Sequence, residues 1–211
     1  MTHTWGYYAN ILTSIMVIVN PIGGIPIFVS LAESQPPSFR HRTAWVCGSA
    51  VAIILIISVF AGEPILHLFG IGLPSFKVGG GILIMIMAIA MMHAKHGGTR
   101  HTQDEADEAA DKDSIGVVPL AMPLLAGPGA ISTVIVFSHQ MSSISDKLIL
   151  SICCAIVGIT VWIVLRLSDS IAKFLGRTGI NIVTRLMGLF LTAISVEFIV
   201  SGLKVLLPGL R

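Results

Sequence analysis

Charged residues are scarce in this chain. Only 11% of its 211 residues are Asp, Glu, Lys or Arg, and 54% are hydrophobic, whereas a soluble domain contains roughly 25% charged residues. This composition excludes an ordinary soluble domain and predicts an integral membrane protein, with the lipid bilayer as its surroundings. The net charge of +2 comes from basic residues scattered between apolar stretches, so nucleic acid is not expected as a partner.

Motifs that would indicate an enzyme are also missing. The sequence has no nucleotide-binding motif, so direct use of ATP is not expected. Its three cysteines lie in apolar stretches without CxxC spacing, and we interpret them as small buried side chains. A membrane thiol oxidoreductase that uses the neighbouring Cys153 and Cys154 is an alternative of a different class. We predict that the protein is not an enzyme and has no cofactor.

Six stretches are apolar enough to cross a membrane, which takes about 20 residues as a helix. They cover residues 7–31, 44–69, 76–92, 115–137, 148–167 and 186–207, and the second is expected to end as early as Pro64 or as late as residue 69. Six crossings place both termini on one side. The first, third and fifth loops hold nine of the thirteen Lys and Arg residues. The positive-inside rule therefore predicts that these loops are cytoplasmic and that both termini are periplasmic.

The first and fourth stretches each contain a helix-breaking cluster. The sequence Asn-Pro-Ile-Gly-Gly-Ile-Pro begins at Asn20, and Met-Pro-Leu-Leu-Ala-Gly-Pro-Gly begins at Met122. Proline removes a helix N–H group and clashes with the preceding turn, and the freed backbone groups cannot face lipid. Breaks at corresponding positions of two halves of a membrane protein are typical of a transporter's binding site.

The two halves of the chain are similar in the spacing of their prolines and glycines. Three pairs of prolines or glycines at matching places are each 107 residues apart. If each half is a repeat of three spans, the second repeat must enter the membrane from the opposite face. We predict an all-α integral membrane protein of six transmembrane helices, arranged as two inverted three-helix repeats (residues 1–93 and 115–211), with the first and fourth helices broken at the midplane. The three pairs are Pro21 and Pro128, Gly72 and Gly179, and Gly81 and Gly188.

Residues 94–114 form the one long polar segment between the predicted repeats. This segment contains six of the eleven acidic residues of the chain, together with two histidines. Because such a composition cannot bury a core, we interpret it as a solvated cytoplasmic linker. A metal-sensing or regulatory loop is the alternative, but the histidine spacing is too loose to predict a metal site.

The breaks themselves supply the candidate binding residues. An Asn-Pro pair suits the N-cap and first position of a helix, so each half-helix would present free N–H groups and a positive dipole end to the membrane interior. Glycines beside these groups let a small ligand approach the backbone, and two such ends would form a cradle for a carboxylate. The predicted substrate-binding residues are Asn20, Pro21, Gly23, Gly24, Gly127, Pro128, Gly129, Ala130, Ser132 and Thr133.

Glu197 lies near the centre of the sixth stretch. A carboxylate at that depth is costly, so we expect Glu197 to face the bundle interior. It is the candidate for coupling transport to a proton or another cation, or for pairing with a substrate ammonium group; the alternative is a protonated acid that hydrogen-bonds to a neighbouring helix. Glu63 and His139 lie at predicted helix ends, and we interpret them as solvated or interfacial.

Two segments of the sequence resemble a known family. Residues 20–28 resemble the N-P-x-G-x-x-P-x-F signature of the MarC family of bacterial inner-membrane proteins, and residues 118–131 resemble its second signature. The similarity extends over nearly the whole chain and is weakest in residues 94–114. It implies a six-span protein of the lysine-exporter-like superfamily and a role in transporting small neutral amino acids.

We therefore predict a secondary transporter of small neutral amino acids, such as glycine, alanine or serine, in the bacterial inner membrane. An exporter of other small metabolites or of drugs is the alternative. Drug export needs a wide cavity lined by aromatic side chains, and only 7% of the residues are aromatic. The sequence leaves open the cargo, the direction of transport, the coupling ion and whether the protein is a homo-oligomer.

Overall fold

Every secondary-structure element of the described chain is helical. The computed structural model describes residues 5–25, 28–29, 36–93, 125–141, 143–207 and 209. The predicted linker (residues 94–114) and the first half of the fourth apolar stretch lie outside these residues. The helices are α1 (Trp5–Val19), α3 (Pro37–Leu68), α4 (Leu73–Met92), α6 (Pro128–His139), α7 (Ile144–Arg166) and α8 (Ser168–Leu206).

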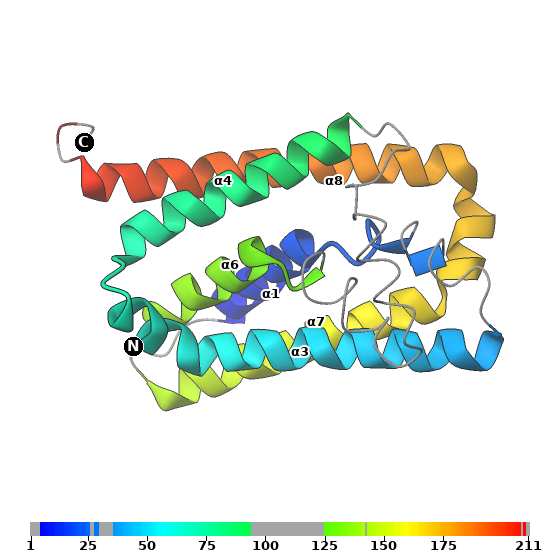
Figure 1. Cartoon of the computed structure of the whole chain (residues 1–211), viewed down its shortest axis with the longest axis horizontal. Helices are drawn as coiled ribbons and strands as arrows, with labels where there is room; N and C mark the ends of the chain where they lie inside the picture. The colour runs from blue at the N-terminus through cyan, green and yellow to red at the C-terminus, as the bar shows by residue number, and fades with distance from the viewer. Residues whose placement is uncertain are drawn as a thin grey trace.

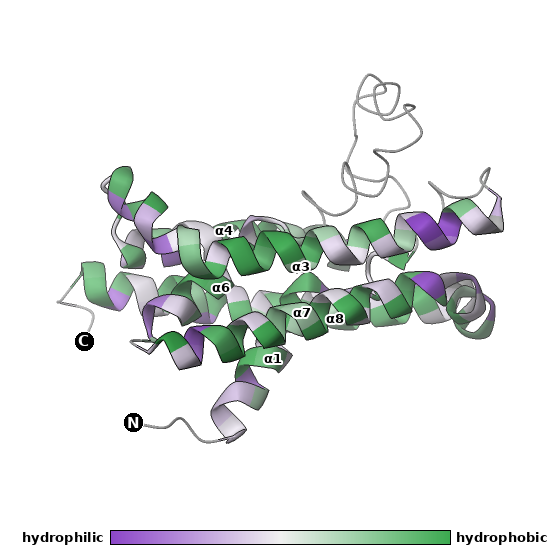
Figure 2. Cartoon of the chain, turned by 90° about the horizontal axis from the view of Figure 1, so that it is seen from below, coloured by the Kyte–Doolittle hydropathy of each residue, from purple (hydrophilic) through white to green (hydrophobic). Residues whose placement is uncertain are grey.

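The helices form three layers (Figure 1). Helix α4 packs along α8, helix α3 packs along α7, and α1 and α6 lie between these two pairs. Hydrophobic residues dominate the middle of the long helices, and hydrophilic residues gather towards their ends (Figure 2). Four segments are long and apolar enough to cross a membrane, Ser38–Leu68, Leu73–Met92, Ile144–Arg166 and Thr178–Leu206, and α1 and α6 are shorter apolar helices. The chain is thus an integral membrane protein.

Proline and glycine mark several helix boundaries. Helices α3, α4 and α6 each have proline in the first turn. An N–H group at that position would have no acceptor within the helix, so proline costs no hydrogen bond there. Two residues after the end of α3 at Leu68 comes Gly70, whose φ of 65° lies in the left-handed region. The N–H of Ile71 then donates to the carbonyl of Leu66 at 2.9 Å, which is the hydrogen bond of a Schellman cap.

One predicted helix boundary was wrong. Helix α3 continues through Pro64 to Leu68, in agreement with the later of the two ends expected for the second span. Helix α8 begins at Ser168, whereas a loop was predicted up to residue 185. A sharp turn at Gly176, with φ of 62°, separates the first part of α8 from the membrane-spanning part. The polar residues before Gly176 were mistaken for a loop because hydropathy detects the span and not the helix that precedes it.

Helices α4 and α8 pack closely because each has a glycine that lies against the backbone of the other. A Cβ atom on Gly81 would lie 3.0 Å from the carbonyl oxygen of Ser195, and one on Gly188 would lie 3.0 Å from the carbonyl oxygen of Ala88. Ser195 follows Ala88 by 107 residues, the same separation that relates Gly188 to Gly81. Small residues at such crossings let two membrane helices approach closely.

The pairing of α3 with α7 also depends on glycines, and here two glycines face each other directly. A Cβ atom on Gly48 would lie 2.7 Å from the carbonyl oxygen of Gly158, and one on Gly158 would lie 2.6 Å from the carbonyl oxygen of Gly48. Trp162 packs over this crossing and lies edge-on to Trp45, with ring centroids 5.2 Å apart. The two backbones approach so closely that neither crossing position has room for a side chain.

Candidate functional site

The first chain break follows α1 at Asn20. Asn20 has a φ of 47°, in the left-handed region that asparagine tolerates better than most residues. Its N–H still donates to the carbonyl of Met16 at 2.9 Å, so α1 is closed before the chain turns. Residues 21–24 form turns, and the chain is helical again at Ile25.

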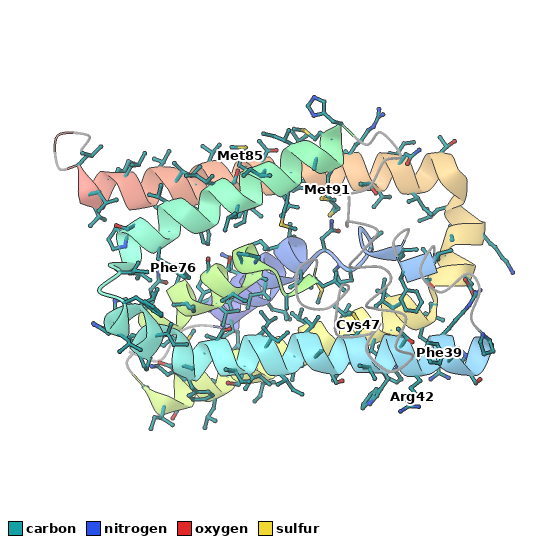
Figure 3. The ribbon with its side chains drawn as sticks, in the orientation of Figure 1. Phe39, Arg42, Cys47, Phe76, Met85 and Met91 are labelled. Atoms are coloured by element: carbon teal, nitrogen blue, oxygen red, sulfur yellow. The ribbon has the colours of Figure 1, made fainter. Side chains whose placement is uncertain are left out.

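The buried side chain of Asn20 holds this turn in place. Its Oδ1 accepts a hydrogen bond from the N–H of Gly23 at 3.2 Å, and its Nδ2 donates to the sulfur of Met91 at 3.5 Å. Met91 reaches towards the central layer from α4 (Figure 3). The Asn20 side chain accepts from Gly23 as a cap would, but residues 21–24 form turns and no helix begins at Pro21. The link to Met91 was not foreseen, because no sequence pattern relates residues that are 71 positions apart.

Two N–H groups of this turn are engaged, contrary to the prediction that they are free. The N–H of Gly23 donates to Asn20, and the N–H of Gly24 donates to the carbonyl of Pro21 at 3.2 Å. Pro21 itself has no N–H group. The tight turn therefore uses two of the donors that an extended N-cap would have left exposed.

The second break differs because the start of α6 has no side-chain cap. The N-cap residue is Gly127, with an extended backbone (φ −68°, ψ 176°), and among the described residues no side chain caps the first turn. Pro128 provides no donor, so the N–H groups of Gly129 and Ala130 form the positive end of this helix. Both residues are buried, and no acidic residue lies in the first turn. This end of α6 is suited to an anionic group.

The two breaks lie against each other, but their glycines are covered. A Cβ atom on Gly24 would lie 3.2 Å from Leu125, the residue that precedes the second break by two positions. One on Gly129 would lie 2.5 Å from Ile84 and 3.6 Å from Ile18. The expectation that these glycines leave the backbone open is therefore not met in this conformation, since three aliphatic side chains fill the space.

Ser132 and Thr133 are buried in α6. The Thr133 hydroxyl donates to the carbonyl of Gly129, one of the predicted binding residues, on the preceding turn at 2.8 Å. The Ser132 side chain packs onto Gly80 of α4, where a Cβ atom would lie 2.6 Å from the serine oxygen. In this conformation the Thr133 bond lies within α6, and Ser132 packs α6 against α4.

Glu197 is exposed on α8, so the prediction that it faces the bundle interior was wrong. Ser195 and Ile199 of α8 pack against Gly81 of α4, and a residue two positions from either lies on the opposite side of a helix. The small residues of α8 determine which side meets α4, and Glu197 is not on that side. The structure therefore does not bring Glu197 together with the break residues.

The three cysteines are free and buried in α3 and α7, as expected of small apolar side chains. The residues considered for the metal-sensing alternative lie outside the described residues, in the predicted linker.

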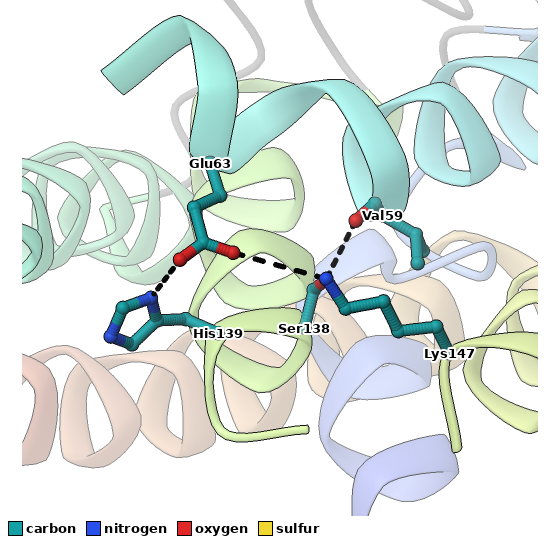
Figure 4. Close-up of polar contacts among 5 residues, drawn as sticks. All are labelled: Val59, Glu63, Ser138, His139 and Lys147. Carbon is teal, nitrogen blue, oxygen red and sulfur yellow. Dashed lines mark hydrogen bonds and ion pairs between the residues drawn. The ribbon is translucent and has the colours of Figure 1, made fainter. Parts of the chain in front are cut away.

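An ion-pair cluster links three helices at one end of the bundle (Figure 4). Near the end of α3, Glu63 Oε1 lies 2.9 Å from His139 Nδ1 of α6, and Glu63 Oε2 lies 3.8 Å from Lys147 Nζ of α7. Ser138 strengthens the contact by donating to the carbonyl of Val59 at 2.6 Å. We call this the Glu63 cluster. From the sequence, Glu63 and His139 were interpreted as solvated or interfacial helix ends, and their pairing was not predicted.

A second ion pair links α3 to α8 at the opposite end of the bundle. Arg40 Nη1 lies 2.9 Å from Asp169 Oδ2 and 3.2 Å from Asp169 Oδ1. Arg40 and Glu63 are 23 residues apart on α3, which separates them by about 35 Å along the helix. Each end of α3 is thus joined to the second half of the chain by an ion pair.

Comparisons with known proteins show a strong similarity to membrane proteins of bacteria and archaea. A family model described as "MarC family integral membrane protein" matches residues 5–207. The chain is 42% identical over 203 residues to the UPF0056 membrane protein YhcE of Escherichia coli (strain K12), covering 96% of this chain and 94% of that protein. It is 40% identical over 200 residues to the UPF0056 membrane protein MJ1677 of Methanocaldococcus jannaschii, covering 94% and 96%. No solved structure matches.

Proposed function

The chain belongs to the MarC family of integral membrane proteins, and we propose that it is a secondary transporter of small neutral amino acids of the glycine, alanine and serine type. We place it in the bacterial inner membrane with both termini in the periplasm, as the distribution of basic residues favours. The observation that carries the proposal is the buried and uncapped start of α6, held beside the turn that Asn20 forms after α1.

The proposed architecture is a six-span inverted repeat. Helix α1 and the helical residues after its break would form the first span, and α6 would complete the fourth. The glycine contacts between α4 and α8 support this arrangement, because a shift of 107 residues exchanges the contact of Gly81 with Ser195 and that of Gly188 with Ala88, as a pseudo-two-fold axis would require. Repeats of this kind place the substrate where the broken helices meet.

In the proposed complex the substrate carboxylate binds the N–H groups of Gly129 and Ala130, with the Asn20 amide beside it. A helix start binds an anion through its N–H groups and its dipole together. The side chains of Ile18, Ile84 and Leu125 occupy the space over the glycines in this conformation and must move aside to admit a substrate. Because only a few aliphatic groups are displaced, a small cargo suits the site best.

A neutral cargo also agrees with the polar residues of the interior. The buried polar residues of the described chain are all uncharged, so none could balance a cargo with a net charge. A zwitterion brings its own balance, and freed carbonyl groups near the breaks would accept its ammonium group. These buried polar residues are Asn20, Thr43, Ser58, Ser132, Thr133, Ser138, Ser168 and Ser195. Coupling to a proton or cation through Glu197 stays a prediction.

We assign the two ion-pair sites to the two gates of the transporter. Alternating access requires one repeat to rock against the other, so that the site opens to one side at a time. The Glu63 cluster and the Arg40–Asp169 pair each join α3 to the second half of the chain, at opposite ends. Opening at either end would break the pair at that end.

Reversing the charge of Arg40 is expected to disturb transport more than stability. An exposed ion pair contributes about 0.2–1 kcal/mol to the free energy of unfolding, so Arg40→Asp should remain folded. Its transport rate should fall roughly tenfold, which corresponds to about 1.4 kcal/mol at the gate, because two acidic residues would hold that end open. The double variant Arg40→Asp/Asp169→Arg is the control and should regain most of the rate. Equal rates in both variants would contradict a gating role.

A counterflow assay tests the proposed function. Liposomes that contain the purified protein are loaded with unlabelled glycine or alanine and given the labelled amino acid outside. We expect saturable accumulation of label above that of protein-free liposomes. Absence of accumulation by protein that elutes as a folded species would refute amino acid transport. Accumulation of a larger metabolite or a drug in its place would favour the alternative exporter.

A further inference from the structure

Glu197 is an exposed acid at the depth of the membrane interior. Ser195 and Ile199, on either side of it, pack against Gly81, which is the ninth of the twenty residues of α4. Glu197 therefore lies near the middle of the bilayer, where an ionisable side chain is costly unless it finds a hydrogen-bonding partner. Lipid tails cannot provide one.

The described part of the chain gives Glu197 no partner at this level. Lys204 is the nearest basic residue along α8, and it is seven residues away, about 10 Å along the helix axis. Arg185 is twelve residues away, about 18 Å. Among the described residues, Glu197 takes part in none of the hydrogen bonds or ion pairs that join α8 to other helices. Its partner must come from outside this set.

The residues around Glu197 form a straight seam suited to another helix. Five of the exposed residues of α8 are spaced at alternating intervals of four and three, the spacing at which two helices pack along each other, and one polar position in such a seam can set the register and the number of chains. Ala193, one turn before Glu197, is small enough for a second helix to approach closely. We call this surface the α8 seam; it consists of Leu186, Phe190, Ala193, Glu197 and Val200.

The corresponding surface of α4 lacks this polar position. The residues that lie 107 positions before those of the α8 seam are all exposed, and they are Gly79, Leu83, Ile86, Ala90 and His93. Ala90 takes the place of Glu197. The one polar residue of the α4 surface, His93, lies just after the end of α4, so the middle of this surface can remain against lipid without an unsatisfied group, whereas the α8 seam cannot.

We propose that a second copy of this chain packs on the α8 seam, so that the two Glu197 carboxyl groups hydrogen-bond to each other. A protonated carboxyl group both donates and accepts, so the pair is self-complementary, as a two-fold interface requires. The two copies of α8 then run parallel, with Ala193 of each copy close to the two-fold axis. This inference does not depend on the transported substrate.

Disulfide cross-linking in native membranes tests the interface. The background variant replaces Cys47, Cys153 and Cys154 with serine, and Ala193→Cys is then added and oxidised. We expect most of the protein to migrate as a covalent dimer. The matched control is Ile86→Cys, which is exposed at the corresponding position of α4 and should remain monomeric. Cross-linking of Ala193→Cys no greater than that of Ile86→Cys, in folded protein, would overturn the proposal.

Two substitutions of Glu197 test the carboxyl pair. Glu197→Gln keeps a group that both donates and accepts, so the Ala193→Cys cross-link should be retained. Glu197→Leu has no such group, and the dimer should dissociate about tenfold more readily on dilution in detergent, since a hydrogen bond between membrane helices contributes this order of affinity. Equal dimer fractions for the leucine and glutamine variants would refute the pairing, even if a dimer forms.

Discussion

Replacing Gly158 with leucine is expected to prevent stable packing of α3 against α7. A side chain at this position would start 2.6 Å from both the carbonyl oxygen of Gly48 and the Cβ of Ala52. Neither atom can rotate away, so the helices must separate and lose their contact. Overpacking of a well-packed site costs about 1–3 kcal/mol or more, and we expect about 3 kcal/mol here. For a chain of this size that lowers Tm by roughly 6–12 °C, measurable as loss of the folded peak in gel filtration after heating.

Two controls separate close packing from a general intolerance of leucine. Gly79 is exposed on α4, and an added Cβ there meets nothing within 4 Å, so Gly79→Leu should melt close to the unmodified protein. Gly48→Leu should match Gly158→Leu, because the two contacts are reciprocal. If Gly79→Leu were as damaging as Gly158→Leu, the close crossing would not be the cause.

Asn20 is expected to be the most sensitive position for transport. Asn20→Ala loses the hydrogen bond to Gly23, worth about 0.5–2 kcal/mol for a helix cap, and places alanine at a left-handed φ of 47°, which costs about 1–3 kcal/mol. We expect a lower Tm and at least roughly tenfold slower counterflow, a transition-state loss of about 1.4 kcal/mol.

Asn20→Gly distinguishes the shape of the turn from the chemistry of the amide. Glycine adopts positive φ readily and costs only a few tenths of a kcal/mol at a cap, so this variant should melt nearly as the unmodified protein does. If the amide contacts the substrate, Asn20→Gly should still transport about tenfold more slowly. Transport at the unmodified rate by Asn20→Gly would show that Asn20 acts only by shaping the turn.

The end of α1 and the start of α6 were predictable because they depend on local conformation. Proline lacks a donor and restricts φ, and Asn and Gly tolerate the left-handed region, so the end of α1 at Asn20 and the start of α6 at Pro128 follow from neighbouring residues alone. Whether the backbone N–H groups at these two places are hydrogen-bonded could not be predicted from the neighbouring residues. A tight turn engages two of them after Asn20, whereas an extended Gly127 leaves the start of α6 uncapped.

The orientation of Glu197 was not predictable from hydropathy. A membrane helix meets apolar groups both in the bundle and in lipid, so an apolar pattern does not distinguish its inner side from its outer side. The small residues of α8 carry a better signal, since Gly188, Ser195 and Gly202 lie along one side. That side meets α4, and Glu197 is left facing outwards.

The amino-acid sequence by itself determined that this is a membrane protein, where its apolar stretches lie and where the backbone must break, because these properties depend on composition and on each residue's own conformational limits. Only the tertiary structure decided which side of α8 meets α4, how the glycines are covered, and that Arg40 pairs with Asp169 and Glu63 with His139. Those contacts join segments that are far apart in the sequence. They depend on the shapes and hydrogen-bonding groups that meet when the helices pack together.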